Sequence, residues 1–189
     1  ASDVYKRQAD TLATQIDRLN TDRRTEEAAA RMAAEQLAEE KLAAQPDLPV
    51  LVLAGQNWHE GVIGIVAGRL KDAYHRPVII ISFDAQGQGK GSARSVAGFS
   101  IGDHILAACD VGYLKSGGGH DMAAGLGLDE VKLADFETFL IDRARAVFSG
   151  VPQRVFSYCH SISVAGCNPA LVDGLDAVGP FGAGHAEPR

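Results

Sequence analysis

Two short, strongly apolar runs separated by a helical stretch restrict the fold of this chain more than any other feature. Residues 50–54 form a continuous apolar run, and residues 77–83 are apolar apart from Ser82, as expected of strands that are buried on both faces. Between them, residues 61–72 are predicted to form a helix with one apolar face. A strand, a helix and a second strand form a right-handed crossover unit. The sequence therefore predicts an α/β domain.

The rest of the domain is predicted from shorter patterns. Its expected elements are a strand at 90–95, a helix at 101–109, a strand at 124–128 and an amphipathic helix at 129–148. Ser100 precedes the first of these helices as an N-cap. Beyond residue 152, a new strand is expected at 155–158 and a short helix at 169–178.

The N-terminal part of the chain is rich in helix formers. Residues 9–44 contain no Gly or Pro, and we expect a short helix ending at Leu19. Asn20 then caps a long helix over 21–44, whose Ala-rich, highly charged composition is typical of a helix that bridges two domains. Residues 1–8 do not fit this periodic pattern, and we interpret them as a non-native leader outside the fold.

Charge and cysteine usage exclude several classes of protein. The net charge of −6 argues against binding nucleic acid through bulk positive charge, so a polyanion must bind at a local cluster. Apolar runs are too short to span a bilayer. The 3 cysteines show no CxxC spacing, which favours reduced thiols of a cytoplasmic protein over a disulfide framework or a zinc site.

The run Gly117-Gly118-Gly119-His120 is the strongest candidate for chemistry. Consecutive glycines can bring backbone N–H groups close to a ligand and form an anion-binding nest. A protonated His120 can add a charge-assisted hydrogen bond to the same anion. The run therefore predicts a phosphate-binding turn, although a glycine-rich turn whose histidine only caps a neighbouring element fits the tetrapeptide equally well.

Two further clusters could contact a phosphate. Strand alternation places Lys90, Ser92 and Arg94 on one face, where they match a phosphodiester, although a solvated strand face explains the same alternation. Trp58 and His59 lie at the start of a helix that follows a strand, a position where α/β folds bind anions. Alternatively, His59 caps that helix with Trp58 packed beneath it.

The chain lacks the motifs of a complete hydrolytic centre. There is no HExxH, Walker A or GxSxG motif, and Asp and His residues are not grouped at metal-ligand spacing. No catalytic site and no metal site can therefore be assembled from this sequence.

Four ordered motifs, WHEGVIGIVAGRL, RPVIIIS, GKGSARSVAGFSI and SGGGHDMAAGL, resemble the DHHA1 domain of RecJ-type single-stranded-DNA-specific exonucleases. LNTDRRTEE resembles the entry to that family's linker helix, and VGPFGAGHAEP resembles the segment leading into its OB-fold, with His185-Ala186 in place of Asn-Pro. The resemblance implies linker helices at 9–47, a DHHA1 domain with a mixed sheet flanked by helices at 48–150, and a truncated OB-fold start at 151–189.

The resemblance also implies an activity. Members of this family degrade single-stranded DNA from 5′ to 3′ in repair and recombination, using two Mn²⁺ or Mg²⁺ ions held by a DHH domain that is absent here. The chain would then be the half that grips the strand, inactive alone and without a metal of its own. Single-stranded DNA is the implied partner of a monomer, with a single-strand-binding protein or helicase as partners of the intact enzyme.

The implied DNA contacts follow from matching motifs. They are Ser92, Arg94 and Ser95 on phosphate or sugar, Gly118, Gly119 and His120 as a turn nearest the scissile phosphate, and Trp58 and His59, with Lys90 added from strand alternation. The alternatives are a DHH/DHHA1 phosphoesterase acting on oligoribonucleotides or 3′-phosphoadenosine 5′-phosphate, and a non-catalytic nucleic-acid-binding module like that of alanyl-tRNA synthetases. The linker helix, the GKGSARS strand and the GPFG segment favour the exonuclease.

Overall fold

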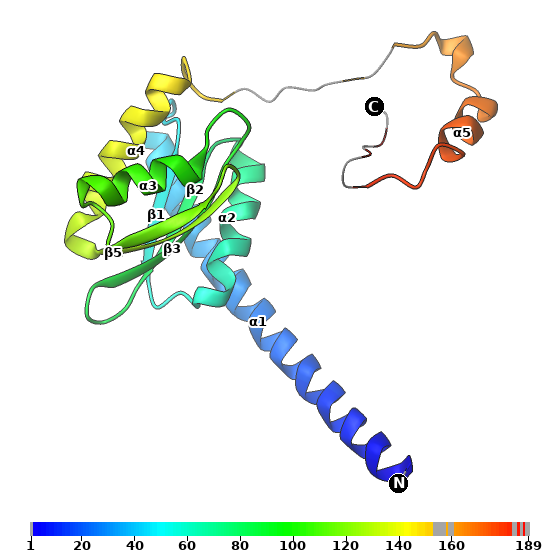
Figure 1. The fold of residues 1–189 in the computed structure, drawn as a ribbon, viewed down its shortest axis with the longest axis horizontal. Coiled ribbons are helices and arrows are strands. Elements are labelled where there is room, and N and C mark those ends of the chain that lie inside the picture. The colour runs from blue at the N-terminus through cyan, green and yellow to red at the C-terminus, as the bar shows by residue number, and fades with distance from the viewer. Residues whose placement is uncertain (1, 153–157, 159–160, 183–184, 186, 188–189) are drawn as a thin grey trace. The chain divides into compact units, whose positions relative to one another are not determined.

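The computed structural model describes residues 2–152, 158, 161–182, 185 and 187 and divides the chain into two compact units, 1–152 and 153–189. The first unit contains a sheet with four long helices (Figure 1). Its elements are α1 (Ser2–Ala44), β1 (Leu51–Gln56), α2 (Glu60–Tyr74), β2 (Val78–Phe83), β3 (Gln88–Arg94), α3 (Ile101–Val111), β4 (Ser116–His120), β5 (Ala123–Asp129), the 3₁₀ turn η1 (Glu130–Lys132) and α4 (Leu133–Val147). The second unit contains η2 (Val164–Gly166) and α5 (Pro169–Asp176).

The sheet is mixed, with strand order β1-β2-β3-β5-β4. Strands β1 and β2 are parallel and joined through α2, as the crossover prediction requires, whereas β3, β5 and β4 pair antiparallel. The predicted α/β architecture with a mixed sheet flanked by helices is confirmed.

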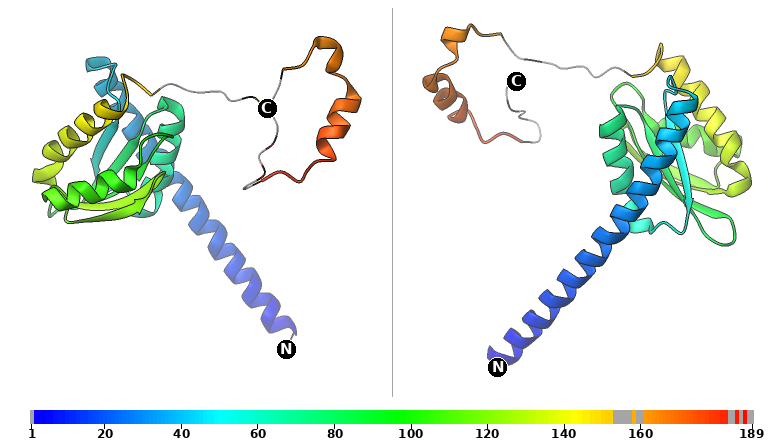
Figure 2. Two further views of the ribbon diagram at one scale, coloured as in Figure 1. Left: turned by 45° about the horizontal axis from the view of Figure 1, so that its top comes forward. Right: turned by 180° about the vertical axis from the view of Figure 1, so that it is seen from behind.

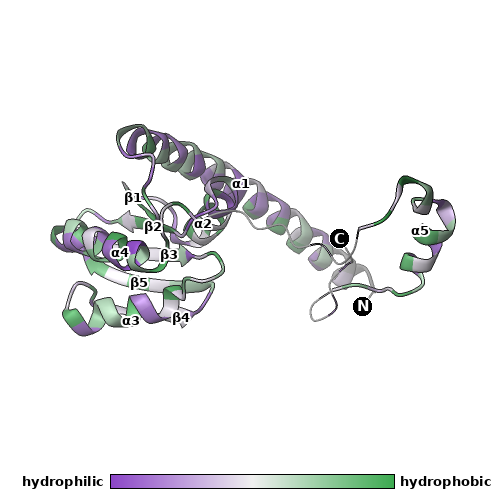
Figure 3. Cartoon of the chain, turned by 90° about the horizontal axis from the view of Figure 1, so that it is seen from above, coloured by the Kyte–Doolittle hydropathy of each residue, from purple (hydrophilic) through white to green (hydrophobic). Residues whose placement is uncertain are grey.

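Helices cover both faces of the sheet, giving three layers (Figure 3). Strand β2 shows why: Ile79, Ile81 and Phe83 join an apolar cluster with α3 and α4, whereas Val78 and Ile80 join a second cluster with α1 and α2. The back view in Figure 2 shows α1 and α2 on their shared face. Both faces of the central strands are therefore buried, which explains their continuous hydrophobicity.

The expected break at Asn20 is wrong, because the single helix α1 runs over Ser2–Ala44. A capping residue does not end a helix that contains no Gly or Pro, and the Thr21 hydroxyl here donates back to the Asp17 carbonyl at 2.9 Å. Residues 2–8 extend this helix, and their assignment to a non-native leader stays a prediction. Only its C-terminal half is packed, with Ala34 and Ala38 fully buried.

The segment after β5 also differs from its prediction. The expected helix at 129–148 is a 3₁₀ turn followed by α4, and Val131 is exposed rather than part of an apolar face. The short helix expected at 169–178 is confirmed as α5. Of the strand expected at 155–158, residues 155–157 lie outside the described residues. No helix within the described part of the chain is long and apolar enough to cross a membrane.

Candidate nucleic-acid interface

Strand β3 presents three polar side chains on one face. Lys90, Ser92 and Arg94 are at least partly exposed, while Gly89, Gly91 and Ala93 between them are buried, so the predicted alternation is confirmed. Arg94 donates from Nη1 to Ser92 Oγ at 3.0 Å and to the Ala93 carbonyl at 2.8 Å. Within the described residues no carboxylate pairs with Arg94, so its charge is available to an anion.

The prediction that the triple glycine forms a phosphate-binding turn is wrong in its local structure. Residues 117–119 lie within β4 in extended conformation. Close packing explains why glycines occur there. A β-carbon on Gly117 would lie 2.4 Å from Ile105 Cγ2 on α3, and one on Gly119 would lie 2.3 Å from the Ala123 carbonyl oxygen on β5. The run therefore lets an edge strand approach its neighbours closely and does not form a backbone nest.

Sheet register nevertheless brings the predicted cation and histidine onto one face. Arg94 pairs with Ala123 across β3 and β5, and Ala123 pairs with His120 across β5 and β4. Directly opposed residues point to the same face of a sheet, so Arg94 and His120 share a face with one strand between them, about 10 Å apart at two strand spacings.

The next row of paired residues on this face of the sheet consists of small residues. Ser92 pairs with Gly125, which in turn pairs with Gly118. Helix α2 borders this surface on one side. It lies so close that a β-carbon on Gly64 would be 3.0 Å from Arg94 Nη2. The resulting groove is lined by Glu60, Gly61, Ile63, Gly64, Ile65, Lys90, Gly91, Ser92, Arg94, Gly125 and Leu126. We call this surface the β3–β5 groove.

Lys90 lies at one end of the β3–β5 groove. Its ammonium is 2.8 Å from the Glu60 carboxylate, and both side chains are well exposed. Exposed ion pairs of this kind contribute little and exchange readily with other partners. An incoming phosphate therefore competes with Glu60 for Lys90, which makes this lysine a weaker anion contact than Arg94.

Trp58 and His59 are held by structural contacts. His59 Nδ1 accepts a hydrogen bond from the Gly61 N–H at 3.0 Å and so caps α2, and it lies 3.8 Å from a Glu26 carboxylate oxygen. A β-carbon on Gly55 would lie 2.3 Å from the Trp58 ring, so the indole packs over that glycine. Both residues line a hollow next to the groove, which shares Glu60, Gly61 and Lys90 with it.

Ser95 is not part of the groove. It is fully buried, and its hydroxyl donates to the Phe99 carbonyl at 2.6 Å, which corrects the expectation that it contacts DNA. Its backbone N–H donates to the Met122 carbonyl at 3.0 Å, in the turn after His120. Ser95 therefore positions the β4–β5 hairpin.

Ser100 holds the same hairpin from the other side. It occupies the N-cap position of α3, as predicted, but its hydroxyl donates to Asp121 Oδ1 at 2.8 Å instead of capping the helix. The Ile101 N–H donates to the Asp121 carbonyl at 3.0 Å. These contacts fix the residue next to His120 and thereby the end of β4.

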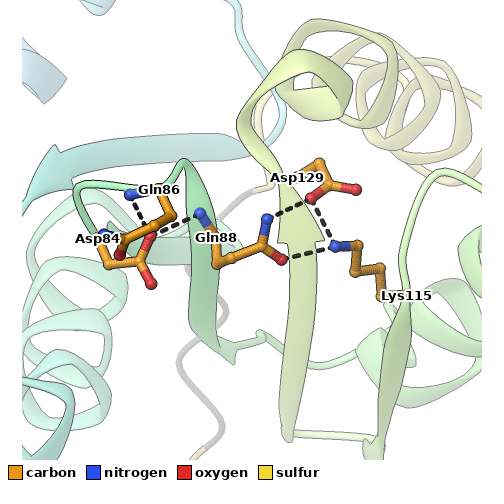
Figure 4. A network of polar contacts seen from close by, with 5 residues as sticks. All are labelled: Asp84, Gln86, Gln88, Lys115 and Asp129. Atoms are coloured by element: carbon orange, nitrogen blue, oxygen red, sulfur yellow. Dashed lines mark hydrogen bonds and ion pairs between the residues drawn. The ribbon is translucent and has the colours of Figure 1, made fainter.

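A polar network joins the other ends of the same strands (Figure 4). Lys115 contacts Asp129 Oδ1 at 2.6 Å, and the Gln88 side chain donates to the same oxygen at 2.8 Å while accepting from Lys115. Asp84 accepts two backbone hydrogen bonds in the turn before β3. The hydrogen bonds from Lys115 and Gln88 hold the pKa of Asp129 below its ordinary value.

Sequence reasoning assigned no role to Gly64, Ala123 or Gly125. A usable signal was present in β5, where Ala123, Gly125 and Gly127 alternate with buried Ala124, Leu126 and Leu128. Gly64 offered no such signal, because its role depends on where α2 crosses β3. Across the described part of the chain, no group of three His, Cys, Asp or Glu residues could hold a metal ion.

Fold and groove together define a DHHA1 domain. The family model described as the DHHA1 domain matches residues 47–149, and the chain belongs to this family.

Within that family, the chain is similar to single-stranded-DNA-specific exonucleases named RecJ, so the resemblance predicted from the sequence is confirmed. It is 40% identical to the RecJ of Dickeya dadantii over 138 residues, covering 71% of this chain and 24% of the relative. It is 33% identical to the RecJ of Thermus thermophilus over 182 residues, covering 96% of this chain and 25% of the relative. The chain thus spans about a quarter of the length of these relatives.

Solved structures agree with this similarity. The crystal structure of Thermus thermophilus RecJ in complex with Mn²⁺ superposes with a TM-score of 0.72 at 32% identity, covering 93% of this chain and 25% of that one. A second RecJ structure, bound to manganese, gives a TM-score of 0.58 at 34% identity, covering 72% and 32% of the two chains.

Proposed function

We propose that this chain is the strand-gripping part of a 5′→3′ exonuclease specific for single-stranded DNA, a cytoplasmic monomer that acts in repair and recombination. The observation that carries the proposal is the shared sheet face of Arg94, Ser92 and His120, on which Arg94 has no carboxylate partner among the described residues. Similarity to RecJ proteins supports the substrate class.

The groove suits one sugar–phosphate strand for three reasons. Arg94 offers a guanidinium that matches the oxygens of a phosphodiester, and Ser92 already orients it. Gly118 and Gly125 leave a floor without side chains, on which a backbone can lie closely. His120 adds a donor at the far side of the floor, and we place it nearest the scissile phosphate. Trp58 and His59 border the adjacent hollow.

Hydrolysis requires groups beyond those described here. RecJ structures that hold Mn²⁺ support a metal-dependent activity for the intact enzyme. We assign metal binding to the part of the relatives that this chain does not span, and binding of the DNA strand to this chain.

Fluorescence anisotropy with labelled oligothymidylate tests the proposal on the chain itself. We expect Arg94→Ala to weaken binding by about 1.5–3 kcal/mol, or about 10- to 150-fold, because one charge-assisted phosphate contact is lost. Arg145→Ala is the matched control, since it makes the same change of charge at an exposed site on α4, on the opposite face of the sheet. Equal affinities for the parent chain and Arg94→Ala would overturn the proposal.

A further inference from the structure

A second cleft lies between α1 and α2, next to the β3–β5 groove along α2. It is lined by Arg23, Arg24, Glu27, Ala28, Arg31, Met32, Ile65 and Arg69. Four arginines and one glutamate give this cleft a local charge of +3 on a chain whose net charge is −6. We call it the arginine cleft.

Glu27 holds two of these arginines in place. Its carboxylate is almost completely buried, with one oxygen 2.8 Å from Arg69 Nη2 and the other 3.5 Å from Arg23 Nη1. The Arg69–Glu27 pair ties α2 to α1, whereas the Arg23–Glu27 pair lies within α1, and the cleft keeps an excess of positive charge. Buried carboxylates need such partners, so Arg23 and Arg69 have a structural role.

Arg24 and Arg31 are the cations that remain for a ligand. Arg24 is exposed and, among the described residues, forms no ion pair, whereas Arg31 makes only a partly exposed pair with Glu35 at 3.3 Å. The exposed side chains of Met32 and Ile65 lie beside them and add apolar surface to the cleft.

The cleft and the groove are neighbours along α2. Ile65 lines both, Gly64 borders Arg94 in the groove, and Arg69 lies five residues further along the helix, about 7.5 Å at 1.5 Å per residue. A strand that leaves the groove over Ile65 therefore reaches the arginine cleft, whose acidic lining residue Glu27 is paired with Arg69 and Arg23.

From this arrangement we propose that the arginine cleft is a second phosphate-binding site for the same single-stranded nucleic acid, with Arg24 and Arg31 as its contacts. The proposal rests on the proposed function of the β3–β5 groove. The arginine cleft would be a second contact, which only a strand long enough to extend past Ile65 can make.

The test compares Arg24→Ala/Arg31→Ala with the parent chain by anisotropy, using oligothymidylates of about 2 and about 15 nucleotides, of which only the longer one extends well past Ile65. We expect the double variant to lose about fivefold in affinity for the longer probe at low salt and little for the shorter one. The slope of log affinity against log salt should become shallower by about 1.4, the value for two phosphates on a single strand.

Two controls distinguish a loss of positive charge from a loss of folding as the cause of weaker binding. Arg24→Lys/Arg31→Lys keeps both charges and should restore the salt slope, and thermal melting checks that each variant is folded. Unchanged binding of the longer probe in Arg24→Ala/Arg31→Ala, together with weakened binding in Arg94→Ala, would overturn the proposal for the arginine cleft but not the proposal for the β3–β5 groove. Binding that neither set of changes affects would overturn both.

Discussion

Gly64 is the residue of α2 that faces Arg94 and Ser92 in the β3–β5 groove. A β-carbon there would lie 3.0 Å from Arg94 Nη2 and 3.1 Å from Ser92 Oγ. Alanine can be accommodated because the guanidinium is the flexible end of a side chain, but leucine would displace it and fill the groove. We therefore expect Gly64→Leu to weaken binding of single-stranded DNA at least tenfold in an anisotropy titration.

Gly68 provides the matched control, one turn further along α2. A β-carbon there would have no atom within 4 Å, so Gly68→Leu should leave affinity unchanged. Replacing a glycine inside a helix also stabilises that helix by up to about 1 kcal/mol, which thermal melting of Gly68→Leu should show. A similar loss of affinity in both variants would mean that leucine acts through the helix and not through the groove.

Strand alternation predicted the residues of β3 correctly as far as it was applied. It placed Lys90, Ser92 and Arg94 on one face, and the structure agrees. Applied one residue further, the same rule puts Ser95 on the opposite face, where it is buried. The family motif alone assigned Ser95 to DNA, and the period of two in a strand was the stronger guide.

At the scale of elements, the network at the ends of β3, β5 and β4 gives the sheet a pH-dependent contact. The hydrogen bond from Lys115 and then that from Gln88 lower the pKa of Asp129. A lowered pKa in the folded state means that the contribution to stability is complete above the ordinary aspartate pKa of about 4 and is lost as the pH falls through the folded-state pKa.

We therefore expect Asp129→Asn to be less stable than the parent chain at neutral pH and equally stable once the pH has fallen below the folded-state pKa of Asp129, where both carry an uncharged group. Urea unfolding between about pH 2 and pH 7 measures this difference. Asp110→Asn, an exposed change on α3, should give a flatter difference over the same range. A gap between Asp129→Asn and the parent that persists unchanged at the acid end would contradict the assignment.

Elements with strong side-chain patterns were predictable, and elements without them were not. Strands β1 and β2 are buried on both faces, so their apolar runs identified them and the crossover between them. Residues 117–119 have no side chains to form a pattern, so a turn and an edge strand fit equally well. Pairing with Ala123 and its neighbours on β5 and packing against Ile105 on α3 make this segment a strand in the fold.

At the scale of the whole molecule, too, contacts between distant segments could not be predicted from sequence patterns. Arg94 and His120 belong to separate motifs that were both assigned to one DNA strand, and the sheet order β3-β5-β4 brings them to one face. Sheet order depends on long-range pairing that single-sequence patterns do not encode. The arginine cleft was missed for a similar reason, since Arg24 and Arg69 belong to helices that meet only in the folded domain.

The two units differ in how much apolar surface they bury, which leads to a prediction about truncation. Both apolar clusters lie within residues 30–144, and none of the described hydrophobic residues of 153–189 is buried. Because burial of apolar surface is the dominant stabilising contribution, the first unit should fold without the second. We expect a chain ending at Pro152 to keep its free energy of unfolding within about 0.5 kcal/mol in urea titrations. Since the groove residues all precede this end, affinity for a short oligothymidylate should stay within about twofold, and a larger loss would place a DNA contact in residues 153–189.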